Sequence, residues 1–298
     1  MSLSIKKLSA SPHASSASLW LNRCAVQWPP SSPGASFAAL WGTGMATSTQ
    51  HGWRVISERA WVFEYAFAKH GTANCFAFRL ANGGVVVLSP ACDMSEGAYS
   101  DLARLGEVTA LVATNGHHHL GIGAFRRRFP DARVYAPLLA RARIAKKNPD
   151  AGELAPLSEL LPSLGHDVVI REAPHTRSGE IWAFFKCEVG YVWFVSDILV
   201  NIEPLPEALI PRLIFRWSGS GPGYRVFHAA LALIVKDKKA VLRALLADAE
   251  THPPAVVVPA HGAPLGDGAP GSRPAAVGGI SATEVAERTL SLLRGALA

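Results

Sequence analysis

The sequence has few of the features that mark membrane-spanning, disulfide-bonded or disordered proteins. No apolar run reaches the roughly 18 residues that a membrane-spanning helix needs, so we expect no membrane association. The four cysteines show no CxxC-type spacing, which gives no basis for a cysteine zinc site or a disulfide framework. Charged residues make up only 17% of the chain and hydrophobic residues 49%, a balance typical of a folded chain with a sizeable core. Together these features favour a cytoplasmic protein.

Acidic residues are missing from the start of the chain, where the first is Glu58. Residues 1–44 contain three basic side chains and no acid, so they contribute +3 to the net charge of +6. The other +3 belongs to the rest of the chain, which gives little reason to expect nucleic-acid binding. Residues 1–50 are rich in Ser, Ala and Pro and are interpreted as a disordered extension, as sequence upstream of a true start at Met45, or as an organelle-targeting segment. Residues 51–298 are expected to form the folded domain.

Hydrophobic patterning predicts strands clustered early and late in the domain, with strands and helices alternating between them. Asn82-Gly83 lies between two apolar runs and predicts a hairpin, because both residues accept a positive φ. Ser281, with Glu284 three residues on, predicts the start of a C-terminal helix. Other strands are predicted at 61–67, 74–80, 85–88, 108–114, 133–136, 168–171, 181–186, 191–196 and 256–258, and other helices at 95–105, 124–129, 137–147 and 237–249. Two β-rich halves with intervening helices predict an α/β fold, a four-layer αββα sandwich.

Four of these strands lead into histidine or aspartate residues. The strand at 108–114 is followed by the run His117-His-His119, and the three later strands are followed by His175, Asp197 and His261. Open α/β sheets place ligands at the carboxyl ends of their strands, and imidazole and carboxylate are ligands of zinc, iron and manganese. In an extended loop His117 and His119 would point to the same side, so we expect His118 to point away from the site and to have no role there.

The order and spacing of these segments resemble the metallo-β-lactamase superfamily. Its pattern is an HxHxDH loop after a strand, then a middle histidine, an aspartate after a strand and a late His-Gly. The resemblance covers roughly residues 53–265 and implies a metallo-β-lactamase-like αββα domain. It also implies a metal-dependent hydrolase-like activity, in which a metal-bound water attacks an ester, thioester, amide or phosphodiester of a small-molecule substrate.

The chain departs from that pattern in its first motif, which reads Asn115-Gly-His-His-His-Leu120. Asn115 and Leu120 stand where the family has histidines, and His119 stands where it has an aspartate. The resemblance therefore implies one divalent metal rather than two, zinc or alternatively iron. The predicted ligands are His117, His119, His175, Asp197 and His261, and the predicted catalytic residues are Asp197 and His119.

Two functions from different classes remain open at this point. The loss of donors at Asn115 and Leu120 favours a catalytically silent binding or regulatory protein that keeps the fold. The retention of the three later donor residues favours a metal-dependent hydrolase. Residues 211–225 mix arginines and aromatic residues with glycines, and they are interpreted either as a lid over a substrate or as a long solvent-facing connection. The sequence does not indicate an oligomeric state.

Overall fold

The computed structural model describes residues 48–68, 71–266 and 280–298, all within a unit that spans residues 37–298. The expectation for residues 1–50 falls almost entirely outside the described residues. In the described part of the chain, no helix is both long and apolar enough to cross a membrane.

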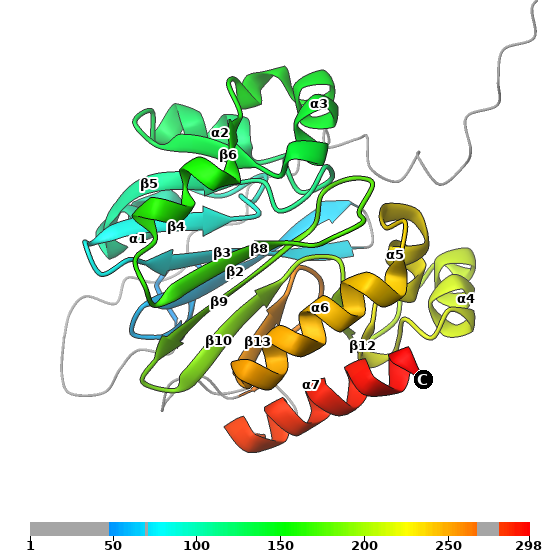
Figure 1. Ribbon diagram of the computed structural model, residues 1–298. Helices are drawn as coiled ribbons and strands as arrows, with labels where there is room; N and C mark the ends of the chain where they lie inside the picture. The colour runs from blue at the N-terminus through cyan, green and yellow to red at the C-terminus, as the bar shows by residue number, and fades with distance from the viewer. Residues whose placement is uncertain (1–47, 69–70, 267–279) are drawn as a thin grey trace, which may run out of the picture. The chain divides into compact units, whose positions relative to one another are not determined.

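Seven strands in consecutive order form the first sheet (Figure 1). The strands β1 to β4 pair in antiparallel fashion, and β4 to β7 pair in parallel. The hairpin predicted at Asn82-Gly83 is confirmed, because Phe76 pairs with Leu88 across it. The strands are β1 (Arg54–Ser57), β2 (Ala60–Ala68), β3 (Gly71–Arg79), β4 (Gly84–Leu88), β5 (Glu107–Val112), β6 (Arg133–Ala136) and β7 (Ala155–Pro156).

The second sheet has the strand order β13-β10-β9-β8. Its central strand β10 pairs in parallel with β13 and antiparallel with β9, which is also antiparallel to β8. A separate antiparallel pair joins β11 to β12. These strands are β8 (Val168–Glu172), β9 (Ile181–Cys187), β10 (Gly190–Val195), β11 (Leu199–Ile202), β12 (Gly223–Val226) and β13 (Pro254–Pro259).

Helices α1 to α3 pack on the first sheet and α5 to α7 on the second, and three helices of the described residues begin at a side-chain cap. Ser95, Asp237 and Ser281 each accept a hydrogen bond from the backbone N–H three residues on, as predicted for Ser281. The helices are α1 (Glu96–Leu105), α2 (Ile122–Arg128), α3 (Leu138–Lys147), α4 (Leu209–Trp217), α5 (His228–Ile234), α6 (Lys238–Thr251) and α7 (Ala282–Leu297), with 3-10 turns η2 (Pro149–Ala151), η3 (Leu157–Glu159) and η4 (Leu161–Ser163).

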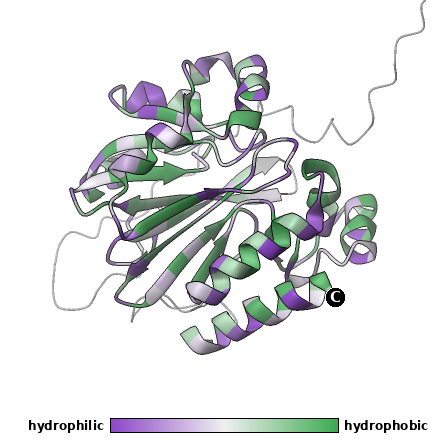
Figure 2. Cartoon of the chain, in the orientation of Figure 1, coloured by the Kyte–Doolittle hydropathy of each residue, from purple (hydrophilic) through white to green (hydrophobic). Residues whose placement is uncertain are grey.

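Alternate side chains of the central strands enter different cores, which builds the four layers. On β10, Val192 and Phe194 point into the core between the sheets, whereas Trp193 and Val195 pack with residues of α5, α6 and α7. On β3, Phe76 likewise enters the inter-sheet core and Cys75 the core beneath α1 to α3. Since both faces of each strand are buried, the central strands are apolar on both sides (Figure 2). The predicted αββα architecture is confirmed.

Residues 211–225 contain regular structure that the sequence pattern did not predict. The first part belongs to α4 and the last part to β12, so the segment is not a glycine-rich loop throughout. Leu209, Ile210, Ile214 and Trp217 of α4 are all largely exposed. The apolar residues Leu209, Ile210, Leu213, Ile214 and Trp217 recur at helical spacing in this helix, but none of them is fully buried.

Asp101 of α1 binds His51, near the start of the described residues, through hydrogen bonds. Its carboxylate is 5% exposed and accepts hydrogen bonds from the backbone N–H and Nδ1 of His51, both at 3.0 Å, and from Arg104 Nη1 at 2.8 Å. Burial alone would raise the pKa of Asp101, but hydrogen bonds from Thr49 and His51 together hold that pKa below its ordinary value. The folded state is therefore stabilised by the ionised form of this carboxyl.

Asp101→Asn is expected to lower the free energy of unfolding by about 1–3 kcal/mol at pH 7, because charge-assisted hydrogen bonds are lost. Since the folded pKa is depressed, the wild-type contribution is complete above the unfolded pKa of about 3.9 and is lost as pH falls through the folded value. Urea unfolding should show a smaller difference at pH 3 than at pH 7. Asp131→Asn, at an exposed aspartate, serves as the control, and an equal Asp101 difference at both pH values would refute the assignment.

Candidate metal centre

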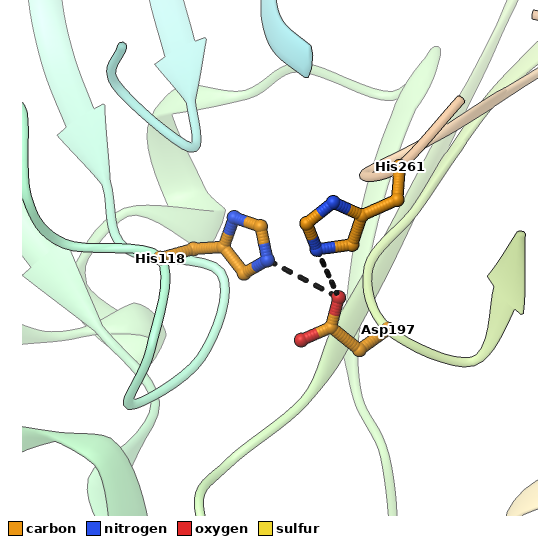
Figure 3. A group of neighbouring side chains, drawn as sticks. All are labelled: His118, Asp197 and His261. Carbon is orange, nitrogen blue, oxygen red and sulfur yellow. Dashed lines mark hydrogen bonds and ion pairs between the residues drawn. The ribbon is translucent and has the colours of Figure 1, made fainter. Parts of the chain in front are cut away.

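Three side chains from the two sheets converge where their strands end (Figure 3). One potential ligand atom from each of His118, Asp197 and His261 lies within 4.8 Å of the other two. Nε2 of His118 is 3.1 Å and Nε2 of His261 is 3.2 Å from Oδ1 of Asp197. His118 and Asp197 are buried and His261 is partly buried. Two imidazoles therefore face a single carboxylate oxygen.

The parallel pairing of β10 with β13 brings Asp197 and His261 together. Val195 pairs with Pro259 at the ends of these strands, and each functional residue follows two positions later. Asp197 and His261 thus leave the same edge of the sheet from neighbouring strands. Gly262 has a φ of +87°, and a Cβ there would lie 1.8 Å from the Asn201 carbonyl oxygen, so only glycine allows the chain to turn past β11 directly after His261.

His118 enters the group because the loop after β5 is a turn rather than an extended strand. Oδ1 of Asn115 accepts hydrogen bonds from the backbone N–H groups of His117 at 2.7 Å and His118 at 2.9 Å. The backbone N–H of His119 then bonds to the His117 carbonyl at 3.1 Å. In such a turn the two-residue alternation of side chains does not apply. The expectation that His118 points away was therefore wrong.

The structure places His117 and His119 beside this group but not within it. Nδ1 of His117 lies 3.4 Å from Nη2 of Arg143, and His119 is 5% exposed with no hydrogen-bond partner for its buried Nδ1. Burial lowers the pKa of both imidazoles to about 4, with further lowering by the charge of Arg143; the charge of Asp197 opposes the shift at His117. Their roles as metal ligands, and the catalytic role of His119, stay predictions.

His175 lies on the exposed loop after β8 and is also outside the group. Its strand is two positions from β10 in the sheet, because β9 lies between them. Neighbouring strands are about 4.8 Å apart, so this order alone separates the two strand ends by about 10 Å. The backbone of His175 has a φ of +51°, and its carbonyl accepts a hydrogen bond from Lys236 N–H. Its assignment as a ligand likewise stays a prediction.

Four residues that the sequence did not single out as site residues hold the three side chains in place. Ser89 Oγ lies 2.8 Å from Nδ1 of His118, and the Thr72 carbonyl lies 2.8 Å from Nδ1 of His261. Nδ2 of Asn115 donates to Oδ2 of Asp197 at 2.8 Å and to the buried Glu180 at 3.1 Å. Ser89 has a positive φ of 53°, which is uncommon for a serine. A backbone angle of this kind is visible in the structure and not in the sequence.

The pKa values of the buried carboxyls of Asp197 and Glu180 are shifted in opposite directions. Burial would raise the pKa of Asp197, but the charge of His118 and hydrogen bonds from both imidazoles hold it well below its ordinary range. Burial and the Asp197 charge raise the pKa of Glu180 well above its ordinary value. Burial lowers the pKa of His261, yet its interactions with Asp197 raise it above the usual value overall. The pair therefore holds its negative charge on Asp197 and its proton on Glu180.

A chain of aromatic contacts connects α4 to this site. The ring centroids of Phe215 and Phe227 are 5.4 Å apart, and those of Phe227 and His261 are 6.1 Å apart. Helix α4 is thus connected to His261 through Phe227. The interpretation of this segment as a lid remains a prediction.

Comparison with known proteins finds likeness at the level of structure only. No family model and no curated protein sequence matches the chain. A metallo-β-lactamase from Pontibacter korlensis superposes over 82% of this chain and 99% of its own, with a TM-score of 0.50 and 14% identity. The chain has the metallo-β-lactamase fold. The metallo-β-lactamase FIM-1 from Pseudomonas aeruginosa gives 84% and 98% coverage, a TM-score of 0.48 and 16% identity.

The metallo-β-lactamase fold predicted from the sequence is thereby confirmed. In this chain the fold gathers the loop after β5, Asp197 after β10 and His261 after β13 at one edge. The altered first motif contributes His118 to that edge, and Asn115 contributes the hydrogen bonds that shape the loop.

Proposed function

We propose that this protein is a metal-dependent hydrolase that binds one divalent ion through His118, Asp197 and His261. Zinc is the metal that we expect first. The proposal is carried by the mutual approach of these three donors to within 4.8 Å. Two imidazole nitrogens and a carboxylate oxygen are the donor set of many catalytic zinc sites, which keep a further position open. His118 takes the place of His117, His119 and His175 in the ligand set that the sequence favoured.

The donor separations fit a metal ion of this size. Two ligands at about 2.1 Å from a tetrahedral ion are about 3.4 Å apart. The imidazole nitrogens of His118 and His261 lie 3.1 Å and 3.2 Å from the carboxylate oxygen of Asp197. A small shift of the side chains is therefore enough to accommodate an ion.

The outer nitrogens of both imidazoles also fit metal binding. The Thr72 carbonyl can only accept, so Nδ1 of His261 carries a proton there. In the metal-free site a protonated His261 can donate to both the Thr72 carbonyl and Asp197. In the neutral imidazole Nε2 would present its lone pair towards Asp197, where a bound cation would lie between them. Ser89 Oγ can accept in the same way from Nδ1 of His118. Such outer partners fix the orientation of metal-binding histidines.

The residues of the chain define what the site can do. A bound Zn²⁺ supplies Lewis acidity and activates water near neutral pH. Two neutral imidazoles and one carboxylate carry a total charge of −1, so the donor set only partly neutralises a divalent ion. Asn115 and Glu180 keep Asp197 oriented from behind, through its Oδ2 and its backbone N–H. The reactions that suit this arrangement are hydrolyses of an ester, thioester, amide or phosphodiester in a small molecule.

Two measurements on the full-length protein test this function. Protein purified without chelators should contain about one divalent ion per chain. A panel of esters, lactones, thioesters, amides and phosphodiesters should reveal a hydrolysis that Asp197→Asn removes and that the exposed control Asp131→Asn retains. If the protein binds no metal, or if Asp197→Asn keeps the wild-type activity, the hydrolase proposal fails and a non-catalytic binding protein is the better account.

A further inference from the structure

Arg143 lies across the loop that contributes His118 to the metal centre. Its Nε donates to the Gly116 carbonyl at 2.9 Å, and its Nη2 is 3.4 Å from Nδ1 of His117. A Cβ at position 116 would lie 2.9 Å from Cδ of Arg143, so the glycine lets the arginine rest against the loop. The guanidinium is thereby held against His117, the residue that precedes the proposed metal ligand His118.

No carboxylate neutralises this arginine in the part of the chain that the structure describes. Other arginines have such a partner: Arg59 pairs with Asp167 at 2.6 Å and Arg104 with Asp101 at 2.8 Å. Arg143 is partly buried, and its helix α3 contains four basic residues and no acidic one. A partly buried charge without a counter-charge costs free energy, and a bound anion would offset that cost.

The same loop holds a second polar group without a partner. Nδ1 of His119 is buried and makes no hydrogen bond to any described residue, although nine-tenths or more of the His119 side chain is enclosed. Buried polar atoms are nearly always paired in folded proteins, so this one calls for a ligand or a bridging water. An arginine without a counter-charge and an unpaired imidazole nitrogen thus lie together on the α3 side of the site.

We propose that Arg143, with His117 and His119 beside it, forms an anion-binding subsite at the edge of the metal centre, and that the substrate carries a carboxylate or phosphate group. The planar guanidinium keeps its charge at every physiological pH and binds either group through two parallel N–H donors. Its Nε is engaged by Gly116 and one N–H of Nη2 faces His117, so the ligand would bind at the end of the guanidinium, to Nη1 and the second N–H of Nη2. The part of this inference that concerns the substrate rests on the proposed hydrolase function.

A direct binding measurement tests the subsite. Titration calorimetry with inorganic phosphate and, separately, with succinate is carried out on metal-free, full-length wild type, Arg143→Gln and Arg141→Gln. Arg141 provides a matched control because it is on the same helix and the substitution removes the same charge. We expect Arg143→Gln to weaken binding of the preferred anion at least tenfold and Arg141→Gln to change it less than twofold. The anion that binds more tightly identifies the group as phosphate or carboxylate.

Arg143→Lys guards against a folding artefact, because it keeps the charge and much of the packing but loses the planar pair of donors. It should bind the anion more weakly than wild type while its thermal midpoint stays near that of wild type. The subsite is overturned if neither anion binds wild type, if both glutamine variants weaken binding equally, or if Arg143→Lys binds as wild type does. Because no metal is present, a failure of the hydrolase proposal would leave this result unaffected.

Discussion

His118→Ala is expected to abolish zinc binding, whereas His175→Ala is expected to leave it unchanged. His118 brings its Nε2 to 3.1 Å from Oδ1 of Asp197, and it is buried in the group of three donors. His175 is exposed on a loop two strands away from β10. Removing an outer-shell partner of a metal ligand already costs 10–100-fold in affinity. Loss of a ligand itself should therefore weaken zinc binding by more than about 100-fold.

The measurement is a competition titration of zinc against a chromophoric chelator, with wild type and both alanine variants. Thermal midpoints of the metal-free proteins provide the control for folding. The two variants separate the ligand set read from the sequence from the set that the structure favours. Loss of zinc binding in His175→Ala, together with its retention in His118→Ala, would show that the donor group seen here is not the metal site.

Asn115→Ala is expected to lower the free energy of unfolding by about 3–5 kcal/mol. The amide of Asn115 is completely buried and bonds to the backbone of His117 and His118, and to Asp197, Glu180 and Ser196. Alanine leaves buried donors and acceptors unpaired, and each such group costs about 1–3 kcal/mol. Since the loop loses its turn geometry, zinc affinity should also fall.

Urea unfolding of the metal-free protein measures the first effect without any contribution from a bound ion. Asn201→Ala is the control, because among the described residues the Asn201 amide makes a single side-chain hydrogen bond, to the Ala263 carbonyl. That substitution should cost less than about 1.5 kcal/mol. A similarly small loss of unfolding free energy in Asn115→Ala would mean that the loop keeps its shape without the asparagine. Asn115 would then be only a replacement of the first histidine in the HxHxDH pattern, with no role in shaping the loop.

The layers of the fold followed from local patterns that do not depend on the tertiary structure. The apolar runs of β3, β10 and β13, the Asn82-Gly83 turn and the Ser281 cap each report on a few neighbouring residues. Helix α4 was missed although its apolar residues recur at helical spacing, because Pro211 lies in its first turn and glycines follow its last residue closely.

The residues of the site likewise differ in whether local sequence patterns or contacts between distant residues place them. The sequence predicted that Asp197 and His261 meet, because each follows an apolar strand, and the parallel pairing of β10 with β13 places both at one edge of the sheet. Only the tertiary structure decided that His118 joins them while His175 does not. The first depends on a turn that Asn115 closes by bonds within the loop and across to Glu180, and the second on β9 lying between β8 and β10. Strand order and side-chain bonds across the sheets arise from residues far apart in the chain, so no local spacing records them.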